Sequence, residues 1–329
     1  MISTFLLEPQ GLRRRENGLD APIPQDAVWI DLFEATLEEE QKIEQFLGIE
    51  VPTREEMREI ETSNRLYEED GALYMTATIV TKLDSDLPEN SQITFILAGN
   101  RLITNRYVDP LPFRRYVTYA DRHATQCATG PAVLSGLLEA IVNRIADVIE
   151  RVGADLDATS TEVFAPPRRR GNRGSGGTAR DFRKILANVG QSGDLISKAR
   201  ETLGSLGRLL VFVQQATSEQ ITQEVRSRLR TISRDVQQMS DHATFLGNKT
   251  QFILDATLGM INIDQNNILK IFSIATVLLL PPSVIGAIFG MNFQYIPTLH
   301  QPWGFWAALG LMVLSAAAPY VIFRRLGWL

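Results

Sequence analysis

The residues best placed to do chemistry lie on one face of a single predicted helix near the C-terminus. Heptad steps place on that face Asp255, Asn262, Leu269, Thr276, Ser283 and Gly290, and an interleaved set adds Gly259, Asn266, Ser273, Leu280 and Ala287. All of them except Leu269 and Leu280 are small or polar. In lipid such a stripe must face protein or water, because hydroxyls and amides are costly against hydrocarbon. Two interpretations stay open: a pore lining, which needs several subunits around an axis, or a helix-packing seam.

Two apolar segments long enough to cross a membrane hold this stripe and its continuation. Between Lys270 and Arg324 the sequence contains no Asp, Glu, Lys or Arg, although 22% of the 329 residues are charged and the net charge is −5. Two spans of about 20 residues and a turn fit in that interval. We therefore predict transmembrane helices over 268–289 and 303–323, joined by a loop over 290–302. A buried helical hairpin in a soluble core is the less favoured alternative.

The basic flanks set the expected orientation of the two spans. Lys270 borders the first span, and Arg324 and Arg325 begin a basic tail over 324–329. Basic flanks favour the cytoplasmic side, so both termini are expected inside and the loop outside. The first five residues lack the basic start and long apolar run of a signal peptide.

The N-terminal part is predicted to be a mixed α/β domain over 1–130. Short β-branched runs predict strands at AVWIDL, ALYMTATIV, SQITFIL and RLITNRYV. The segments ATLEEEQKIEQFLG and TREEMREIE have helical spacing, with Thr at possible N-caps. The single cysteine, Cys127, excludes an intrachain disulfide framework and a thiolate zinc site, and we expect it in the core.

Helices are predicted from residue 131 to the first membrane span. An apolar stripe at three- and four-residue steps predicts a helical hairpin over 131–217. Five arginines in its turn would suit nucleic acid or anionic lipid, but a solvated loop is favoured and no nucleic-acid partner is expected. A stalk helix over 218–267 should continue into the first span, because no proline occurs before Pro281 and Pro282. At 1.5 Å per residue this helix would be about 100 Å long, which requires a bundle or an oligomer.

Several motifs together resemble the CorA family of divalent metal-ion (Mg²⁺/Co²⁺) transporters. The tripeptide Gly290-Met291-Asn292 (GMN) follows a span containing Pro281-Pro282, and a second span and the basic tail FRRLGWL come soon after. The segment INIDQNNILKIFSIATVLLLPPSVIGAIFGMNF is similar to the family's stalk and pore helix. The segment TREEMREIETSNRLYEEDGALYMTATI is similar to its cytoplasmic domain. The resemblance covers nearly the whole chain.

The resemblance implies an α+β membrane protein that forms a homopentameric funnel, with the first span lining the pore and the second packing outside. The implied selectivity filter is Gly290, Met291 and Asn292. The implied pore lining is Asp255, Asn262, Asn266, Thr276, Ser283 and Ala287. The implied hydrophobic gate is Leu269, Phe272 and Leu280, and the implied cytoplasmic basic ring is Lys270, Arg324 and Arg325.

The resemblance also implies closure by cytoplasmic Mg²⁺ bound between neighbouring subunits. Such a site needs stalk carboxylates that face carboxylates of the next α/β domain. The candidates by residue type are Asp235 and Asp241 on the stalk, with Glu68, Glu69, Asp70, Asp84 and Asp86 on the domain. For any one of them, a solvated surface carboxylate is the alternative.

The loop after the filter departs from the family pattern at two positions. Relatives commonly read GMNFEFMPEL, whereas Gln294 and Thr298 stand here in place of the two glutamates. The missing charge should weaken long-range attraction of a cation. Neutral amides and carbonyls still suit Mg²⁺, which gives up its water reluctantly.

The predicted function is channel-like transport of Mg²⁺, with Co²⁺ and Ni²⁺ as further ions, across a bacterial plasma (inner) membrane down the electrochemical gradient. Mg²⁺ is then substrate and regulatory ligand, and no organic cofactor is expected. The expected partners are further copies of the chain, membrane lipid and divalent metal ions. The alternatives are a zinc transporter of the ZntB type and a non-conducting membrane-anchored metal sensor or scaffold. An enzyme is not expected, because the three histidines lie in different segments and no phosphate-binding loop or nucleophile motif occurs.

Overall fold

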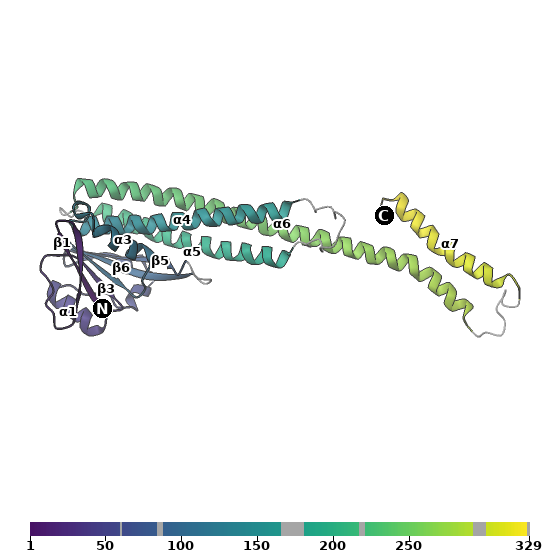
Figure 1. The fold of residues 1–329 in the computed structure, drawn as a ribbon, viewed down its shortest axis with the longest axis horizontal. Coiled ribbons are helices and arrows are strands. Elements are labelled where there is room, and N and C mark those ends of the chain that lie inside the picture. Colours follow the sequence, from purple (N-terminus) through teal and green to yellow (C-terminus); the bar gives the residue numbers. More distant parts are fainter. Residues whose placement is uncertain (60, 84–87, 166–180, 217–220, 292–300, 328–329) are drawn as a thin grey trace. The chain divides into compact units, whose positions relative to one another are not determined.

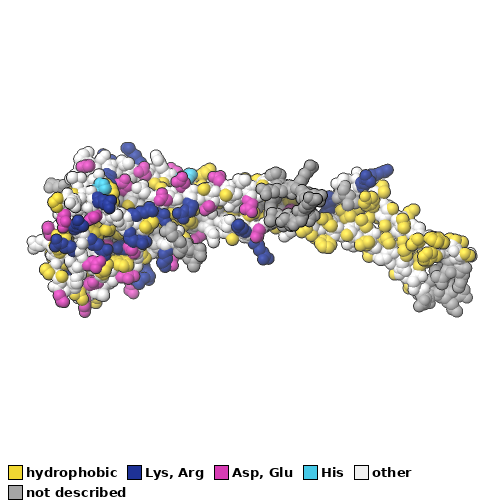
Figure 2. Space-filling model, viewed as in Figure 1, with side chains coloured by type: hydrophobic (Ala, Val, Ile, Leu, Met, Phe, Trp, Pro, Cys, Tyr) yellow, Lys and Arg dark blue, Asp and Glu magenta, His cyan; other side chains and the backbone are white. Residues whose placement is uncertain are grey.

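The computed structural model describes the chain except for residues 60, 84–87, 166–180, 217–220, 292–300 and 328–329 (Figure 1). The described residues form two compact units, Met1–Leu254 and Asp255–Leu329. The boundary falls inside helix α6 (Gln223–Phe289). Figure 2 shows charged side chains over the first unit and mainly hydrophobic ones over α7 (Gly304–Arg325) and the adjoining end of α6.

The first unit is built on a mixed sheet with the strand order β2-β1-β3-β7-β6-β5-β4. Its strands are β1 (Ile2–Glu8), β2 (Gly11–Asn17), β3 (Ala27–Phe33), β4 (Leu66–Glu69), β5 (Ala72–Thr81), β6 (Glu89–Ala98) and β7 (Arg101–Arg106). β3 and β7 pair in parallel, and the other neighbours pair antiparallel. β3, β7 and β5 therefore run in the same direction and end at the same edge of the sheet.

The connections after β3 and β7 leave toward opposite faces of the sheet. After β3 the chain enters α1 (Leu37–Leu47), whose Ile43 packs with Ile30 and Leu32. Thr36 caps this helix in a capping box with Glu39, which satisfies backbone donors at its start. After β7 the chain enters α3 (Leu111–Ala120) on the other face, where Trp29 stacks on Phe5 and contacts two aromatic rings of α3. Side chains alternate along a strand, so adjacent residues Trp29 and Ile30 serve different cores.

A buried ion pair fixes the ends of the two parallel strands. Asp31 of β3 accepts two hydrogen bonds from the guanidinium of Arg106 in β7, at 2.9 and 2.8 Å, and a third from Thr104 at 2.7 Å. The guanidinium also donates to the carbonyl of Val108 at 2.7 Å, which holds the chain as it leaves β7. Both charged side chains are almost fully buried, so each depends on the other for compensation.

Two hydroxyl groups of a neighbouring helix accept hydrogen bonds from the part of β5 that has no described strand partner on that side. β4 pairs only with the first part of β5, from Ala72 to Met75. Beyond it, the N–H groups of Thr78 and Val80 donate to the hydroxyls of Ser205 and Thr202 in α5 (Phe182–Gln215), at 3.0 and 2.9 Å. The hydroxyls satisfy strand donors that would otherwise be open to pairing with another chain.

Three long helices complete the first unit. α4 (Gly130–Phe164) packs against α5, and α6 runs in the same direction as α4. Ion pairs join α4 to α6 at both ends of this contact, Glu139 with Arg228 and Asp157 with Lys249, both at 2.5 Å. The buried side chains of α6 follow heptad steps of three and four: Val225, Leu229, Ile232, Val236, Ala243, Leu246, Thr250, Ile253 and Thr257. This seam is the apolar partner that so long a helix needs.

Several sequence predictions can be compared with these elements. The four predicted strands occur as β3, β5, β6 and β7, and Cys127 is fully buried as expected. The helix predicted for TREEMREIE is wrong: only a 3₁₀ turn over Glu56–Arg58 forms there, and the one-turn helix α2 (Thr62–Arg65) follows it. Met57 is the one buried side chain of the 3₁₀ turn, so no apolar stripe is present to hold a longer helix against the sheet. The structure also contains β1, β2, β4 and α3, which were not predicted.

Replacing Asp31 with Ala should destabilise the first unit, because Arg106 would stay buried without its carboxylate. Breaking a buried pair from one side typically costs about 3–5 kcal/mol. We expect a clearly lower melting temperature for D31A in the detergent-solubilised full chain, measured by circular dichroism. The control D26A removes an exposed carboxylate just before β3 and should leave the melting temperature unchanged. Equal shifts in the two variants would contradict this role of the pair.

Candidate functional site

In the second unit, the partly covered residues of α6 fall on one stripe. Ile274 is buried, and Leu278, Pro281 and Ile285 are half-buried, whereas most neighbouring residues are exposed. These positions continue the heptad steps of the seam that is buried in the first unit. The packed positions of α6 therefore follow the same heptad pattern in both units.

The predicted polar stripe lies on the opposite side of the helix from these covered residues. Thr276, Leu280, Ser283 and Ala287 each come two positions after a covered residue. Two residues advance about 200° around an α-helix, so the two stripes face away from one another. All four are exposed in the chain, as are the other predicted lining residues Asp255, Asn262 and Asn266.

Helix α7 contacts α6 on the covered side. A Cβ added to Gly286 would lie 3.1 Å from the Cε of Met312, so glycine permits a close approach there. Small residues at such contacts are typical of helix pairs in membranes. The polar stripe is therefore not the seam between α6 and α7, and a seam would have to involve another chain.

The hydroxyls of the stripe are oriented by their own helix. Thr276 Oγ1 donates to the carbonyl of Phe272 at 2.9 Å, and Ser283 Oγ donates to the carbonyl of Leu280 at 2.8 Å. Each proton is thereby used within the helix, and the oxygen lone pairs point outward as acceptors. The stripe presents oxygen acceptors at these positions.

A proline pair leaves two backbone carbonyls of α6 without their helical donors. Pro281 and Pro282 lie inside α6 and have no N–H. The carbonyls of Val277 and Leu278, four residues earlier, consequently lack their usual helical donors.

The helix ends at the predicted filter. α6 stops at Phe289, and the N–H of Gly290 still donates to the carbonyl of Gly286 at 2.9 Å. Met291 is about half exposed, at 47%. Asn292, with Gln294 and Thr298, lies outside the described residues. The structure therefore places two of the three filter residues at the end of the polar stripe.

The predicted gate residues are large, apolar and exposed. Leu269, Phe272 and Leu280 are 62%, 68% and 58% exposed, which in a lone chain leaves them uncovered by other side chains. Leu269 and Leu280 belong to the heptad sets of the polar stripe, and Phe272 follows Leu269 by three residues. Lys270 lies in α6 between them, and Arg324 and Arg325 form the last turn of α7.

The predicted regulatory carboxylates do not form a site within the chain. Asp235 and Asp241 are exposed on α6, and Glu68, Glu69 and Asp70 are exposed at β4 and the turn after it. Asp84 and Asp86 lie outside the described residues. Among the described residues, no three His, Cys, Asp or Glu side chains are grouped to hold a metal. Beside these carboxylates, burial and, to a smaller extent, the charge of Glu69 raise the pKa of Tyr67 to about 12.

Both α6 and α7 are long and apolar enough to cross a membrane, with mean hydropathies of 2.1 and 1.8 over their most apolar segments. Only 6% of each of those segments is buried in the chain, unlike a soluble core helix. The chain therefore has two candidate membrane spans, and the polar stripe lies on the side of α6 that faces away from α7.

The chain belongs to the family described as CorA-like Mg²⁺ transporter protein, whose sequence profile matches residues 24–325. The magnesium transport protein CorA of Pasteurella multocida (strain Pm70) is 32% identical over 330 residues, which cover 100% of both chains. The predicted family is thus confirmed. Because the family is one of transporters, its membership also agrees with the prediction that the chain is not an enzyme.

Solved structures agree with this family at the level of the fold. The complete CorA magnesium transporter from Methanocaldococcus jannaschii superposes with a TM-score of 0.74 at 20% identity, covering 100% of this chain and 99% of that one. The ZntB cytoplasmic domain from Vibrio parahaemolyticus gives a TM-score of 0.57 at 10% identity, covering 80% of this chain and 98% of the domain. The predicted fold class, an α/β domain with a long helix and a C-terminal apolar helix, is confirmed.

Replacing Gly286 with Leu should weaken the contact between α6 and α7, because the side chain would overlap Met312. Overpacking of this kind costs about 1–3 kcal/mol. We expect a lower melting temperature for G286L in the detergent-solubilised chain. G310L is the matched control, because it gains the same helix propensity in α7 while nothing lies within 4 Å of its added Cβ. A larger loss in G310L than in G286L would refute the contact.

Proposed function

We propose that the chain assembles into a homopentamer that conducts Mg²⁺, and also Co²⁺ and Ni²⁺, through a pore lined by α6. The observation that carries this proposal is the exposed polar stripe of α6, which faces away from α7 and leads to Gly290. One such helix cannot enclose a pore, so several copies around an axis are required. The family membership of the whole chain supports the same arrangement.

The chemistry of the stripe suits a cation that keeps its water. Water molecules bound to Mg²⁺ donate hydrogen bonds outward, and Mg²⁺ usually retains several of them when it binds. The hydroxyl oxygens of Thr276 and Ser283 accept such bonds. In the proposed filter, the Gly290 carbonyls and the Asn292 amides do the same. Neutral acceptors hold a hydrated ion weakly enough for it to leave, as conduction requires.

The exposed apolar residues give the proposed pore a gate. Rings of Leu269, Phe272 and Leu280 would exclude water from a narrow lumen and so stop a hydrated ion. An inside-negative membrane potential supplies about 2.3 kcal/mol per charge per 100 mV, and twice that for a divalent ion. Transport therefore needs no catalytic residue or organic cofactor.

The basic residues favour a bacterial plasma (inner) membrane protein with both termini in the cytoplasm. Lys270, Arg324 and Arg325 lie at the ends of the two spans that are remote from the filter, where basic residues are expected on the cytoplasmic side. In a pentamer they would form a basic ring around the inner end of the pore, close to lipid headgroups.

The proposal includes regulation by internal Mg²⁺, which would bind at a contact between subunits. Asp235 and Asp241 are exposed and could meet Glu68, Glu69, Asp70, Asp84 or Asp86 of a neighbouring copy. Bound Mg²⁺ would then hold subunits together and favour the closed state, and loss of the metal would release them.

Zinc transport of the ZntB type is the second candidate. The neutral residues Gln294 and Thr298 in the loop are the reason to consider this alternative. They remove the negative charge expected at the mouth of a magnesium pore. The likeness to a ZntB cytoplasmic domain concerns the fold alone. A non-conducting metal sensor is the third candidate, and it requires no open path along α6.

Asn292→Ala should reduce Mg²⁺ uptake into proteoliposomes by more than about tenfold, because five amides would leave the filter. Uptake is measured with a fluorescent Mg²⁺ indicator inside the vesicles under an inside-negative potential. Asn143→Ala, an exposed asparagine on α4, is the matched control and should conduct normally. Unaltered uptake by the Asn292 variant would favour the non-conducting sensor.

The same vesicles distinguish the two transported metals. Mg²⁺ and Zn²⁺ are supplied separately to the unsubstituted chain at equal concentration. The magnesium proposal expects Mg²⁺ uptake that depends on the membrane potential. Strong Zn²⁺ uptake without Mg²⁺ uptake would replace it with the zinc alternative.

Asp235→Asn/Asp241→Asn should weaken inhibition of uptake by Mg²⁺ sealed inside the vesicles, because the neutral amides cannot compensate a divalent charge. We expect the inhibitory concentration to rise several-fold while maximal uptake is kept. The control Asp26→Asn/Asp155→Asn removes two exposed carboxylates that are not among the candidates. An unchanged inhibitory concentration in the first variant would remove both aspartates from the regulatory site.

A further inference from the structure

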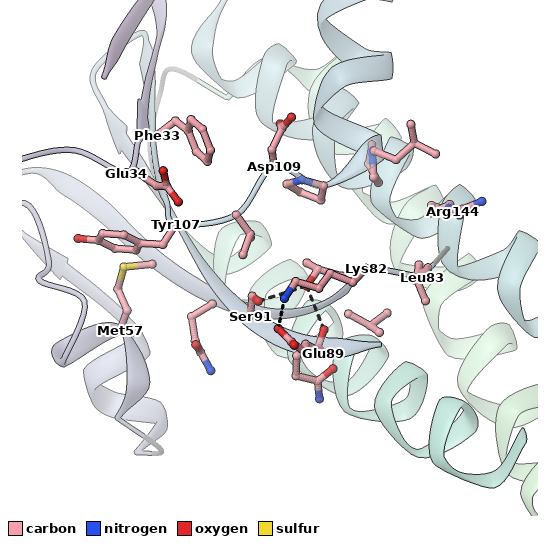
Figure 3. A pocket seen from close by; sticks show the side chains of 18 of the residues that line it. Phe33, Glu34, Met57, Lys82, Leu83, Glu89, Ser91, Tyr107, Asp109 and Arg144 are labelled. Atoms are coloured by element: carbon pink, nitrogen blue, oxygen red, sulfur yellow. Dashed lines mark hydrogen bonds and ion pairs between the residues drawn. The ribbon is translucent and has the colours of Figure 1, made fainter. Parts of the chain in front are cut away.

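A cavity of about 760 Å³ opens at the edge where β3, β7 and β5 end (Figure 3). Its walls include Phe33 at the end of β3, Tyr107 just after β7, and Lys82 just after β5. The chain leaves β3 toward the α1 face and leaves β7 toward the α3 face. Connections that part to opposite faces leave a crevice at the strand ends, which is where α/β sheets commonly bind ligands.

Cationic side chains converge on this cavity from separate parts of the chain. They are Arg54, Arg58, Lys82, Arg114 and Arg144. The acidic side chains among the described lining residues are Glu34, Glu89 and Asp109. Glu89 pairs with Lys82 at 2.8 Å and Asp109 pairs with Arg114 at 3.4 Å. The described lining is therefore more basic than acidic.

Arg54 and Arg58 are the cations most available to a ligand. Both are exposed, and neither forms an ion pair with any described residue. The guanidinium of Arg54 lies over the ring of Tyr107, with Cζ 5.1 Å from the ring centroid. A stacked guanidinium is held in place while the N–H groups at its edge stay able to donate, which suits bidentate binding of phosphate.

Two residues of the cavity hold a backbone conformation that is unfavourable for them. Glu34 and Lys82 have φ angles of 45° and 54°, and only one other non-glycine residue in the described chain has a positive φ. Such strain costs on the order of 1–3 kcal/mol and tends to persist at binding sites, where surrounding structure enforces it. Both residues directly follow strands that end at the cavity, so the turns there are fixed in shape.

We propose that this cavity binds a phosphate-bearing small molecule of nucleotide size. Its volume lies in the range of about 300–1,000 Å³ found for organic ligands. Arg54 and Arg58 would hold the phosphate, and the exposed carboxylate of Glu34 would accept hydrogen bonds from hydroxyl groups of the ligand. Met57 and Pro110 supply apolar wall. A bare metal ion does not fit this lining, since cationic residues outnumber carboxylates in it.

The site is separate from the proposed ion path, because every lining residue belongs to the first unit and none to the stripe of α6. Its test accordingly needs no transport. ATP serves as the probe, titrated calorimetrically into the full chain in detergent with EDTA present, so that divalent metal cannot contribute to binding. Adenosine and inorganic phosphate are titrated separately to identify which part of the probe is recognised.

We expect saturable binding of ATP, with one ATP per chain, and no detectable binding of adenosine. The variant R54A/R58A should bind ATP at least about tenfold more weakly, as loss of charge-assisted hydrogen bonds predicts. The matched control R151A/R200A removes two exposed arginines outside the cavity and should bind as the unsubstituted chain does.

The melting temperature of R54A/R58A guards against a folding defect. Both arginines are exposed, so this variant should melt as the unsubstituted chain does while binding ATP more weakly. Three results would overturn the proposal: no saturable ATP binding, equal affinity in R54A/R58A and the unsubstituted chain, or binding of inorganic phosphate without ATP.

Discussion

The continuous backbone of α6 is the constraint on which both compact units depend. A helix of 67 residues is not stable without partners for its side chains. In the first unit it buries a heptad seam from Val225 to Ile253 against the other helices. In the second unit the same register marks the stripe that α7 approaches at Gly286. Packing on one side leaves the other side of the helix open for a different chemistry.

The polar stripe on the opposite side of α6 has few free hydrogen-bond donors. Thr276 and Ser283 donate their protons to carbonyls of their own helix. The result is a short stretch in which oxygen atoms outnumber available donors. Such a surface matches the outward-pointing hydrogens of a hydrated cation better than it matches an anion.

Much of the fold could be predicted from the sequence where one physical signal dominates. The central strands are β-branched and buried, Thr36 begins α1, and the absence of charge between Lys270 and Arg324 marks the two apolar helices. β2 carries no such signal, because GLRRREN exposes arginines at a sheet edge. The turn near Met57 carries helix formers without an apolar stripe. The cavity at the strand ends arises from connections that leave toward opposite faces of the sheet, which no local sequence pattern predicts. The candidate regulatory carboxylates form no metal-binding group among the described residues.

The back-bonded hydroxyls of α6 have a consequence for what else can pass along the stripe. A side chain relays a proton only if it can accept one hydrogen bond and donate another in turn. Thr276 and Ser283 have committed their protons to Phe272 and Leu280, so they accept from water without passing a proton onward. In the proposed pore these two side chains would add no link to a proton wire, so any proton relay past them would run through water molecules alone.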